Sequence, residues 1–281
     1  MTWRLRIEHH TGFNYGAPVV ASYNEARIMP LSTPEQLVIE AEVTITPPAS
    51  VFRYWDYWGT LVYSFDIHAG HTELEVCGRS QVETSAPRTG GEGTRWDDLR
   101  SPATRDGFAE YLAPTSYVPL AGREIAEAAR ELAAGRSPAD ACRATSAWAR
   151  DRLRYEQGTT TVSTTALDAL AHGSGVCQDF AHVHLALLRS MGVPARYVSG
   201  YLHPHEDAPV GQPVEGESHA WVEAWLGDWM PFDPTNGLPV GERHVVIGRA
   251  RDYADVSPLK GVYHGGPAEA LAVTVTLTRL A

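Results

Sequence analysis

From residue 3 to about residue 85, apolar and polar side chains alternate with a period of two. The alternation is clearest in three stretches, at residues 3–7, 39–45 and 61–67. Successive side chains of a β-strand point to opposite faces, so each stretch predicts a strand with one buried face. Turn residues such as Trp58-Gly59 lie between the stretches. The segment as a whole therefore predicts an antiparallel β domain.

The pattern changes after this domain. Residues 86–105 mix glycine, proline and charged side chains, which is typical of a linker. Residues 122–134 repeat their apolar positions at helical spacing. Ser137-Pro138 then supplies an N-cap and a first-turn proline for a second helix that runs towards Leu153. Helices therefore dominate the middle of the chain.

The most informative helix begins at Cys177. Apolar residues recur at helical spacing from Phe180 to Met191, and Gly192 occupies the position of a C′ glycine. Pro194 prevents the helix from continuing. Cys177 is therefore predicted at the N-terminal end of a helix, directly after a glycine-containing turn.

Strand-like runs follow this helix. They cover residues 195–201, 219–226 and 229–232, and the last two are separated by the turn residues Gly227-Asp228. A final alternating run at 271–278 predicts a C-terminal strand that can return to the first domain. We thus divide the chain into four parts: an N-terminal β domain (1–88), a linker and connecting segment (89–120), a catalytic domain (121–265) and a C-terminal strand (266–281).

The charge of the chain excludes some classes of partner. Lys and Arg total 23 against 34 Asp and Glu, so the formal net charge is -11. A chain with this negative charge offers no basic surface to nucleic acid, and anionic membrane surfaces repel it. The first ten residues alternate and lack the apolar core of a secretory signal, and no stretch is long and apolar enough to cross a bilayer. We expect a cytoplasmic protein without nucleic-acid or membrane partners.

The position of Cys177 suits a nucleophile. A cysteine reacts as the thiolate, which the unpaired N–H groups and the dipole of a helix N-terminus stabilise. The three cysteines, Cys77, Cys142 and Cys177, lie far apart, which fits neither a disulfide framework nor a zinc cluster. Considered alone, however, Cys177 is equally compatible with a buried cysteine that only packs.

A thiolate mechanism also needs a base, and the chain has twelve histidines. His182 and His184 share the helix of Cys177, where packing is the more common role. His203 and His205 resemble a metal-binding pair, but they lie in a polar segment without a regular ligand scaffold. His219 opens a predicted strand, and a strand is a rigid platform for a base. We therefore predict His219 as the base and no metal site.

The third group should be a carboxylate or amide that orients the histidine, and Asp233 follows the next predicted strand. A two-residue hairpin at Gly227-Asp228 would pair residue 222 with 233 and place Asp233 on the face opposite His219. A catalytic Asp233 thus requires a bulge or a longer loop. From the sequence around it alone, a turn aspartate explains Asp233 as well as a catalytic one does.

Four ordered segments closely resemble the bacterial transglutaminase-like family. They are Gly-Ser-Gly-Val-Cys177-Gln-Asp-Phe, Gly-Val-Pro-Ala-Arg-Tyr-Val-Ser-Gly-Tyr, Ser-His219-Ala-Trp-Val-Glu-Ala-Trp and Trp-Met-Pro-Phe-Asp233-Pro-Thr-Asn-Gly. The opening Trp-Arg-Leu-Arg-Ile-Glu-His-His-Thr-Gly-Phe-Asn-Tyr and the later Trp-Asp-Tyr-Trp-Gly-Thr also look like the β domain that accompanies this family.

The resemblance implies an α+β fold with a papain-like transglutaminase core. In such a core a helix-borne cysteine packs on an antiparallel sheet, here accompanied by the N-terminal antiparallel β domain. It implies Cys177 as nucleophile, His219 as base and Asp233 as orienting residue, with no metal or organic cofactor. Gln178, Asp179 and Tyr155 lie beside the motifs and are candidates for positioning substrate or oxyanion, although structural hydrogen bonding is as good an explanation.

The implied activity is acyl transfer on the amide bonds of a peptide or protein through a thioester. Hydrolysis by a peptidase or amidase is our leading interpretation. True transamidation between a glutamine side chain and an amine is the enzymatic alternative, and a noncatalytic binding module that retained the fold is the alternative from another class. The sequence does not indicate the oligomeric state.

Overall fold

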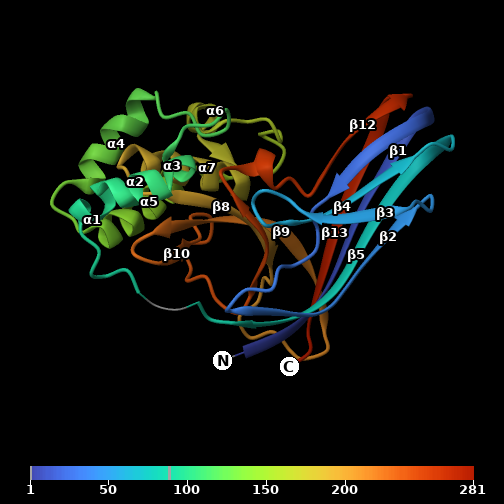
Figure 1. Cartoon of the computed structure of the whole chain (residues 1–281), viewed down its shortest axis with the longest axis horizontal. Helices are drawn as coiled ribbons and strands as arrows, with labels where there is room; N and C mark the ends of the chain where they lie inside the picture. The colour runs from blue at the N-terminus through green and yellow to red at the C-terminus, as the bar shows by residue number, and fades with distance from the viewer. Residues whose placement is uncertain (1, 88–89) are drawn as a thin grey trace.

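The computed structural model describes residues 2–87 and 90–281, and it separates a helical part from a strand-rich part (Figure 1). The helices gather on one side, and the long strands fan out on the other. The two ends of the chain meet, because the backbone N–H of Arg4 donates to the carbonyl oxygen of Ala281 at 3.1 Å.

The strand-rich part is an antiparallel sheet built mainly from the first 85 residues. The predicted alternation in the first strand is confirmed, since Trp3, Leu5 and Ile7 are buried while their neighbours are not. Two strands from the end of the chain complete this part. Its strands are β1 (Thr2–Ala26), β2 (Gln36–Thr46), β3 (Val51–Trp55), β4 (Leu61–Ile67), β5 (His71–Ser85), β12 (Leu259–Gly265) and β13 (Ala268–Arg279).

The helical part surrounds one long buried helix, α7, which packs against α4, α5, α6 and the neighbouring sheet. The predicted cap of α5 is present, because the Ser137 hydroxyl accepts from the backbone N–H of Asp140 at 3.2 Å. Within the described ranges, no helix is long and apolar enough to cross a membrane. The helices are α1 (Trp96–Arg100), α2 (Pro102–Gly107), α3 (Ala109–Leu112), α4 (Arg123–Ala133), α5 (Pro138–Arg152), α6 (Ala166–His172) and α7 (Cys177–Ser190).

The segment that we expected to be a linker is different in the structure. It contains α1, α2 and α3, and Leu99 and Val118 are buried in the same core as α7. The segment does contain a helix start signal that its linker-like composition masked. The Ser101 hydroxyl caps α2, and Pro102 occupies the first turn of this helix. The expected boundary at residues 88–89 lies outside the described residues.

The sheet beside α7 is continuous with the N-terminal sheet. Strand β9 pairs with β8 through residues 217–224 and with β13 through residues 213–216. The strand order is β11-β8-β9-β13-β1-β4-β3, and β10 pairs with β9. The further elements are β6 (Arg154–Tyr155), β7 (Ser174–Gly175), β8 (Ala195–Leu202), β9 (Pro213–Trp225), β10 (Trp229–Phe232), β11 (His244–Ala250) and the short 3₁₀ helix η1 (Tyr253–Asp255).

The two faces of β9 have different roles. Ala220, Val222 and Ala224 are buried in the core that contains α7. Because side chains alternate along a strand, His219 and Trp221 lie on the other face. One face of β9 thus packs against α7, while His219 and Trp221 lie on the opposite face.

Candidate active site

Cys177 is the first residue of α7, as predicted. Two glycines shape the turn before it. Gly173 ends α6 in the left-handed conformation, with φ of 70°, and a Cβ on Gly175 would lie 2.5 Å from the Asp179 carboxylate. The Cys177 side chain is half-buried, and its sulfur lies 3.9 Å from the carbonyl oxygen of Ser218. The thiol therefore sits beside the residue that precedes His219.

The neighbours of Cys177 hold the start of the helix in place. Asp179 accepts hydrogen bonds from the Val176 backbone N–H at 2.8 Å and the Thr160 hydroxyl at 2.7 Å. Burial raises the pKa of this carboxyl. The Gln178 amide donates to the carbonyl oxygen of Val162 at 3.2 Å. The hydrogen bonds of both residues thus hold the loop before α6 against the start of α7. In the structure, both residues therefore have a structural role.

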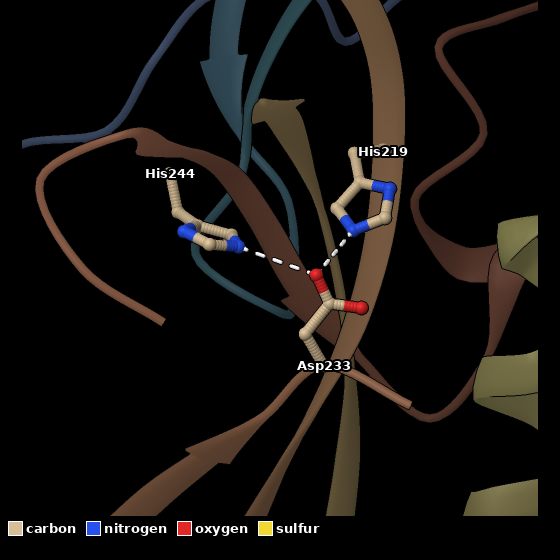
Figure 2. A group of neighbouring side chains, drawn as sticks. All are labelled: His219, Asp233 and His244. Atoms are coloured by element: carbon tan, nitrogen blue, oxygen red, sulfur yellow. Dashed lines mark hydrogen bonds and ion pairs between the residues drawn. The ribbon is translucent and has the colours of Figure 1, made fainter. Parts of the chain in front are cut away.

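The imidazole of His219 and the carboxylate of Asp233 form a buried ion pair. The distance from His219 Nε2 to Asp233 Oδ2 is 2.9 Å, and the two side chains are 3 % and 0 % exposed. Figure 2 shows the carboxylate lying between His219 and a second histidine, His244. The structure therefore brings Asp233 to His219, as a catalytic role requires.

The loop between β9 and β10 explains how Asp233 reaches this face. Trp225 pairs with Trp229 and Val222 with Phe232, so the loop has three residues, Leu226-Gly227-Asp228. Gly227 adopts φ of 82°, which glycine tolerates without strain. The register places residue 233 opposite Trp221, on the same face as His219. A catalytic Asp233 required either a bulge or a longer loop, and the structure has the longer loop.

In the part of the chain that the structure describes, the Asp233 carboxylate is surrounded by hydrogen-bond donors. Oδ1 accepts from the backbone N–H groups of Thr235 at 3.0 Å and Asn236 at 3.1 Å. Oδ2 accepts from His219, from the Asn236 amide at 2.9 Å and from His244 Nε2 at 3.4 Å. Burial disfavours the charge, but the hydrogen bonds from His219 and His244 outweigh it and hold the pKa of Asp233 well below its usual range. The carboxylate stays ionised and acts only as an acceptor.

His244 is a member of this site that the sequence did not reveal. Its Nδ1 accepts from the Gly241 backbone N–H at 3.2 Å, so the neutral ring carries its proton on Nε2 and donates it to Asp233. Burial lowers the pKa of His244, which favours this neutral form. The residue lies outside the four family-like motifs, and nothing in its sequence neighbourhood distinguishes it from a strand residue.

His219 carries a proton at neutral pH. Burial alone would lower its pKa, but the hydrogen bonds and negative charges of Asp233 and Cys177 raise it to about 10. The imidazolium therefore lies between a carboxylate on one side and the Cys177 sulfur on the other. This arrangement can hold a thiolate ready for attack and deliver a proton to a leaving group.

The ligand atoms of His219, Asp233 and His244 lie within 4.8 Å of one another, a spacing that suits a metal ion. Both histidines, however, already direct an Nε2–H group at Asp233, and a protonated imidazole nitrogen is not a ligand. Hydrogen bonding accounts for the cluster and fits the donor set better than a metal site.

The other candidate histidines have different surroundings. His182 and His184 are fully buried, and burial lowers the pKa of each to about 3, so they pack as neutral rings. His203 is also buried, and its Nδ1 accepts from the His205 backbone N–H at 3.2 Å. None of them belongs to the Cys177 site.

A cavity of about 390 Å³ opens beside the pair. Its wall includes His219, Asp233 and Tyr155, so the third residue that we considered for substrate positioning does face the site. Arg243 and Glu215 supply charged groups, and Leu202 and Leu238 supply apolar ones. The cavity thus offers mixed surroundings to an amide-bearing substrate.

Iodoacetamide is expected to label Cys177 before the other two cysteines. Burial raises the pKa of Cys142 to about 12 and also raises that of Cys77. Cys77 is an internal control, because its sulfur also contacts a histidine, His10, at 3.4 Å. Mass-spectrometric mapping after reaction with a limiting amount of iodoacetamide at pH 7.5 measures the order of labelling. If Cys77 or Cys142 is labelled first, the assignment of Cys177 as the nucleophile is contradicted.

Comparisons with known proteins place the chain in a family. Residues 126–234 match the transglutaminase-like superfamily, and residues 5–83 match the bacterial transglutaminase-like N-terminal region. The uncharacterized protein ML0607 of Mycobacterium leprae is 49% identical over 279 residues, which cover 99% of this chain and 100% of that protein. A protein-glutamine gamma-glutamyltransferase of Pseudomonas aeruginosa is 34% identical over 106 residues, 34% of this chain and 15% of that enzyme.

The fold also has a crystallographic counterpart. A Cytophaga hutchinsonii protein, named as a candidate cysteine protease, superimposes with a TM-score of 0.77 at 21% identity and covers 100% of this chain and 93% of its own. Together the two family matches include strands β1 to β5 of the strand-rich part and the part that carries Cys177, His219 and Asp233. The chain therefore belongs to the transglutaminase-like superfamily and carries the bacterial transglutaminase-like N-terminal region.

Proposed function

We propose that the protein is an acyl-transfer enzyme that cleaves amide bonds of peptides or proteins through a thioester on Cys177. The observation that carries the proposal is the buried His219–Asp233 ion pair, whose imidazolium also interacts with the Cys177 sulfur. A nucleophile, a base and an orienting carboxylate in contact are the parts that covalent catalysis requires.

The first half of the reaction forms the thioester. The Cys177 thiolate attacks the amide carbonyl carbon, and the oxyanion accepts hydrogen bonds from the N–H groups at the start of α7, which lack intrahelical acceptors. Collapse of this intermediate breaks the C–N bond. His219 gives its proton to the departing amine, which leaves as a neutral molecule, and its neutral ring remains hydrogen-bonded to Asp233.

The second half consumes the thioester. Neutral His219 removes a proton from water as the oxygen attacks the acyl carbon, and the C–S bond breaks to release a carboxylic acid. The thiolate and the imidazolium are thereby restored. An amine that attacks in place of water yields a new amide by the same steps, so the two outcomes differ only in the acceptor.

We place hydrolysis first because water needs no site of its own, whereas an amine acceptor does. Transamidation is the second candidate, and its specific support is the similarity of about a third of the chain to a protein-glutamine gamma-glutamyltransferase. A noncatalytic binding role is the third, and it is disfavoured because an unused buried ion pair of this kind would be costly to retain.

A partition experiment tests the proposed function. An activated acyl ester or a glutamine-containing peptide is supplied as donor, and the protein is examined for an acyl group on Cys177 by mass spectrometry. Free acid and amine-linked product are then measured as a primary amine is added. We expect mainly free acid at modest amine concentration and no product with Cys177→Ala. Efficient capture by the amine favours transamidation, and absence of an acyl-enzyme with every donor supports the binding module.

A further inference from the structure

A second cavity, of about 380 Å³, also borders His244. Its lining joins the two parts of the chain, with Gln36 and Ser85 from the N-terminal sheet and Trp221, Trp229 and Arg249 from the sheet beside α7. Neither Cys177 nor His219 lines it, and His244 lines both cavities. It is therefore a separate site that shares one wall with the candidate active site.

The floor of this cavity carries more positive than negative charge. Glu223 is buried and accepts from Arg196 Nε at 2.7 Å and from Arg249 Nε at 3.0 Å. Two guanidinium groups thus share one carboxylate, which leaves one positive charge in surplus. Arg196 also stacks on the Trp229 ring, with its guanidinium carbon 4.0 Å from the ring centroid.

The cavity also has unused hydrogen-bond donors. Arg249 bonds to Glu223 only through Nε, and across residues 2–87 and 90–281 neither of its Nη atoms has a side-chain or backbone acceptor. The indole N–H of Trp221 is buried and has no hydrogen-bond partner. A buried donor without an acceptor costs about 1–3 kcal/mol. A ligand that brings acceptors would satisfy these groups.

The nearby acceptors of the chain are occupied or exposed. The Gln36 side chain uses its amide on the carbonyl oxygens of Leu31 and Val246 and its oxygen on the Val246 N–H. Asp228 lies in the exposed hairpin loop and accepts from the Trp229 N–H at 2.8 Å. Glu35 is half-exposed, and its carboxylate accepts from the Thr33 hydroxyl at 3.4 Å. The two acids therefore belong to the outer part of the cavity.

We propose that this cavity binds a small carboxylate that has an apolar body. The carboxylate accepts from the free Nη groups of Arg249, whose planar fork matches its two oxygens, and from the indole N–H of Trp221. The apolar body lies against Trp229, Pro231 and Val240, which also line the cavity. The volume falls in the range of small-molecule sites.

Occupancy of this cavity is transmitted to the candidate active site through His244. The Trp221 ring packs edge-on against His244 at a centroid distance of 5.3 Å and stacks on His219 at 6.0 Å. His244 in turn donates to Asp233. A ligand that reorients Trp221 therefore changes the surroundings of both histidines, and we expect it to change the rate at which Cys177 is alkylated.

The test uses benzoate and its neutral isostere benzamide, at constant ionic strength set with chloride. Binding is measured by calorimetry and by the indole ¹H–¹⁵N NMR signals, of which that of Trp221 is identified with Trp221→Phe. We expect saturable binding of benzoate with a shift of the Trp221 signal, at least tenfold weaker binding of benzamide, and at least tenfold weaker benzoate binding in Arg249→Gln.

Two variants keep this test decisive. Arg143→Gln removes an exposed arginine that pairs with Glu92 on the surface and should bind benzoate like wild type. Arg249→Lys keeps the charge beside Glu223 but loses the planar fork, so it should also bind weakly even if Arg249→Gln fails to fold. Absence of saturable benzoate binding, equal binding of benzamide, or unchanged binding in Arg249→Lys overturns the proposal. None of these binding measurements depends on catalysis, so their outcome does not decide whether the proposed acyl-transfer function is correct.

Discussion

Replacing Asp233 with asparagine is expected to slow acylation of Cys177 about 10⁴-fold, a loss typical of an orienting carboxylate. The reason lies in the contacts of Asp233, since every partner of its two oxygens among the described residues is a hydrogen-bond donor. In either orientation, the amide of asparagine directs N–H groups at other N–H groups. If the amide N–H group faces His219, it favours the tautomer that has no proton on Nε2. The proton then lies on Nδ1, the ring nitrogen that must accept a proton from the Cys177 thiol.

The same substitution should weaken the fold without abolishing it. Each buried donor that loses its acceptor costs about 1–3 kcal/mol, so the thermal midpoint should fall measurably. Single-turnover acylation and thermal unfolding are measured on the same preparations. The matched control is Asp66→Asn, an exposed aspartate of β4 whose carboxylate pairs with His68, and it should behave like wild type. Wild-type acylation by Asp233→Asn would remove this residue from the mechanism, and complete unfolding would make its role structural.

Much of the fold could be predicted from local patterns. The period of two in residues 3–7 and the helical spacing after Cys177 both appear in the structure because each reflects a single face that must be buried. The three helices between Trp96 and Leu112 could not be predicted in this way. They are short and rich in charge, and their positions depend on tertiary contacts such as the Phe108 ring on Trp225 at a centroid distance of 4.5 Å.

The candidate site could likewise be predicted only in part from the sequence. Cys177, His219 and Asp233 stand in motifs, and simple strand geometry already indicated that a catalytic Asp233 needed a bulge or a loop longer than two residues after β9. His244 could not be found, because its place beside Asp233 depends on how β11 pairs with β8 and on one backbone N–H, that of Gly241. The role of Asp179 was also hidden, since only the structure shows that its carboxylate caps the helix of Cys177.

The ring of His219 is expected to remain protonated up to about pH 10, against an ordinary value of 6.5. Such a shift is about a thousandfold or more in proton affinity. Activity should therefore decline above pH 10, because the neutral ring cannot protonate the leaving amine. The charged form also stabilises the fold. This stabilisation is complete below pH 6.5 and is lost as the pH rises towards 10, since the folded-state pKa lies above the unfolded one.

Part of this shift belongs to Cys177, whose hydrogen bond and charge raise the pKa of His219 together with those of Asp233. Cys177→Ala removes that contribution and leaves the ion pair with Asp233, so the pKa of His219 should fall in this variant but stay above 6.5. His10→Ala is the matched control, because it removes the histidine that contacts Cys77 and should leave the titration of His219 unchanged.

The most direct test of a Cys177–His219–Asp233 site is an NMR titration of the His219 ring nitrogens from pH 6 to 11, with the signal assigned by His219→Gln. The proposed site predicts a doubly protonated ring at pH 8, a midpoint near pH 10 in wild type and a lower midpoint in Cys177→Ala. A neutral His219 ring at pH 8 in wild type, or the same midpoint in both proteins, would contradict it.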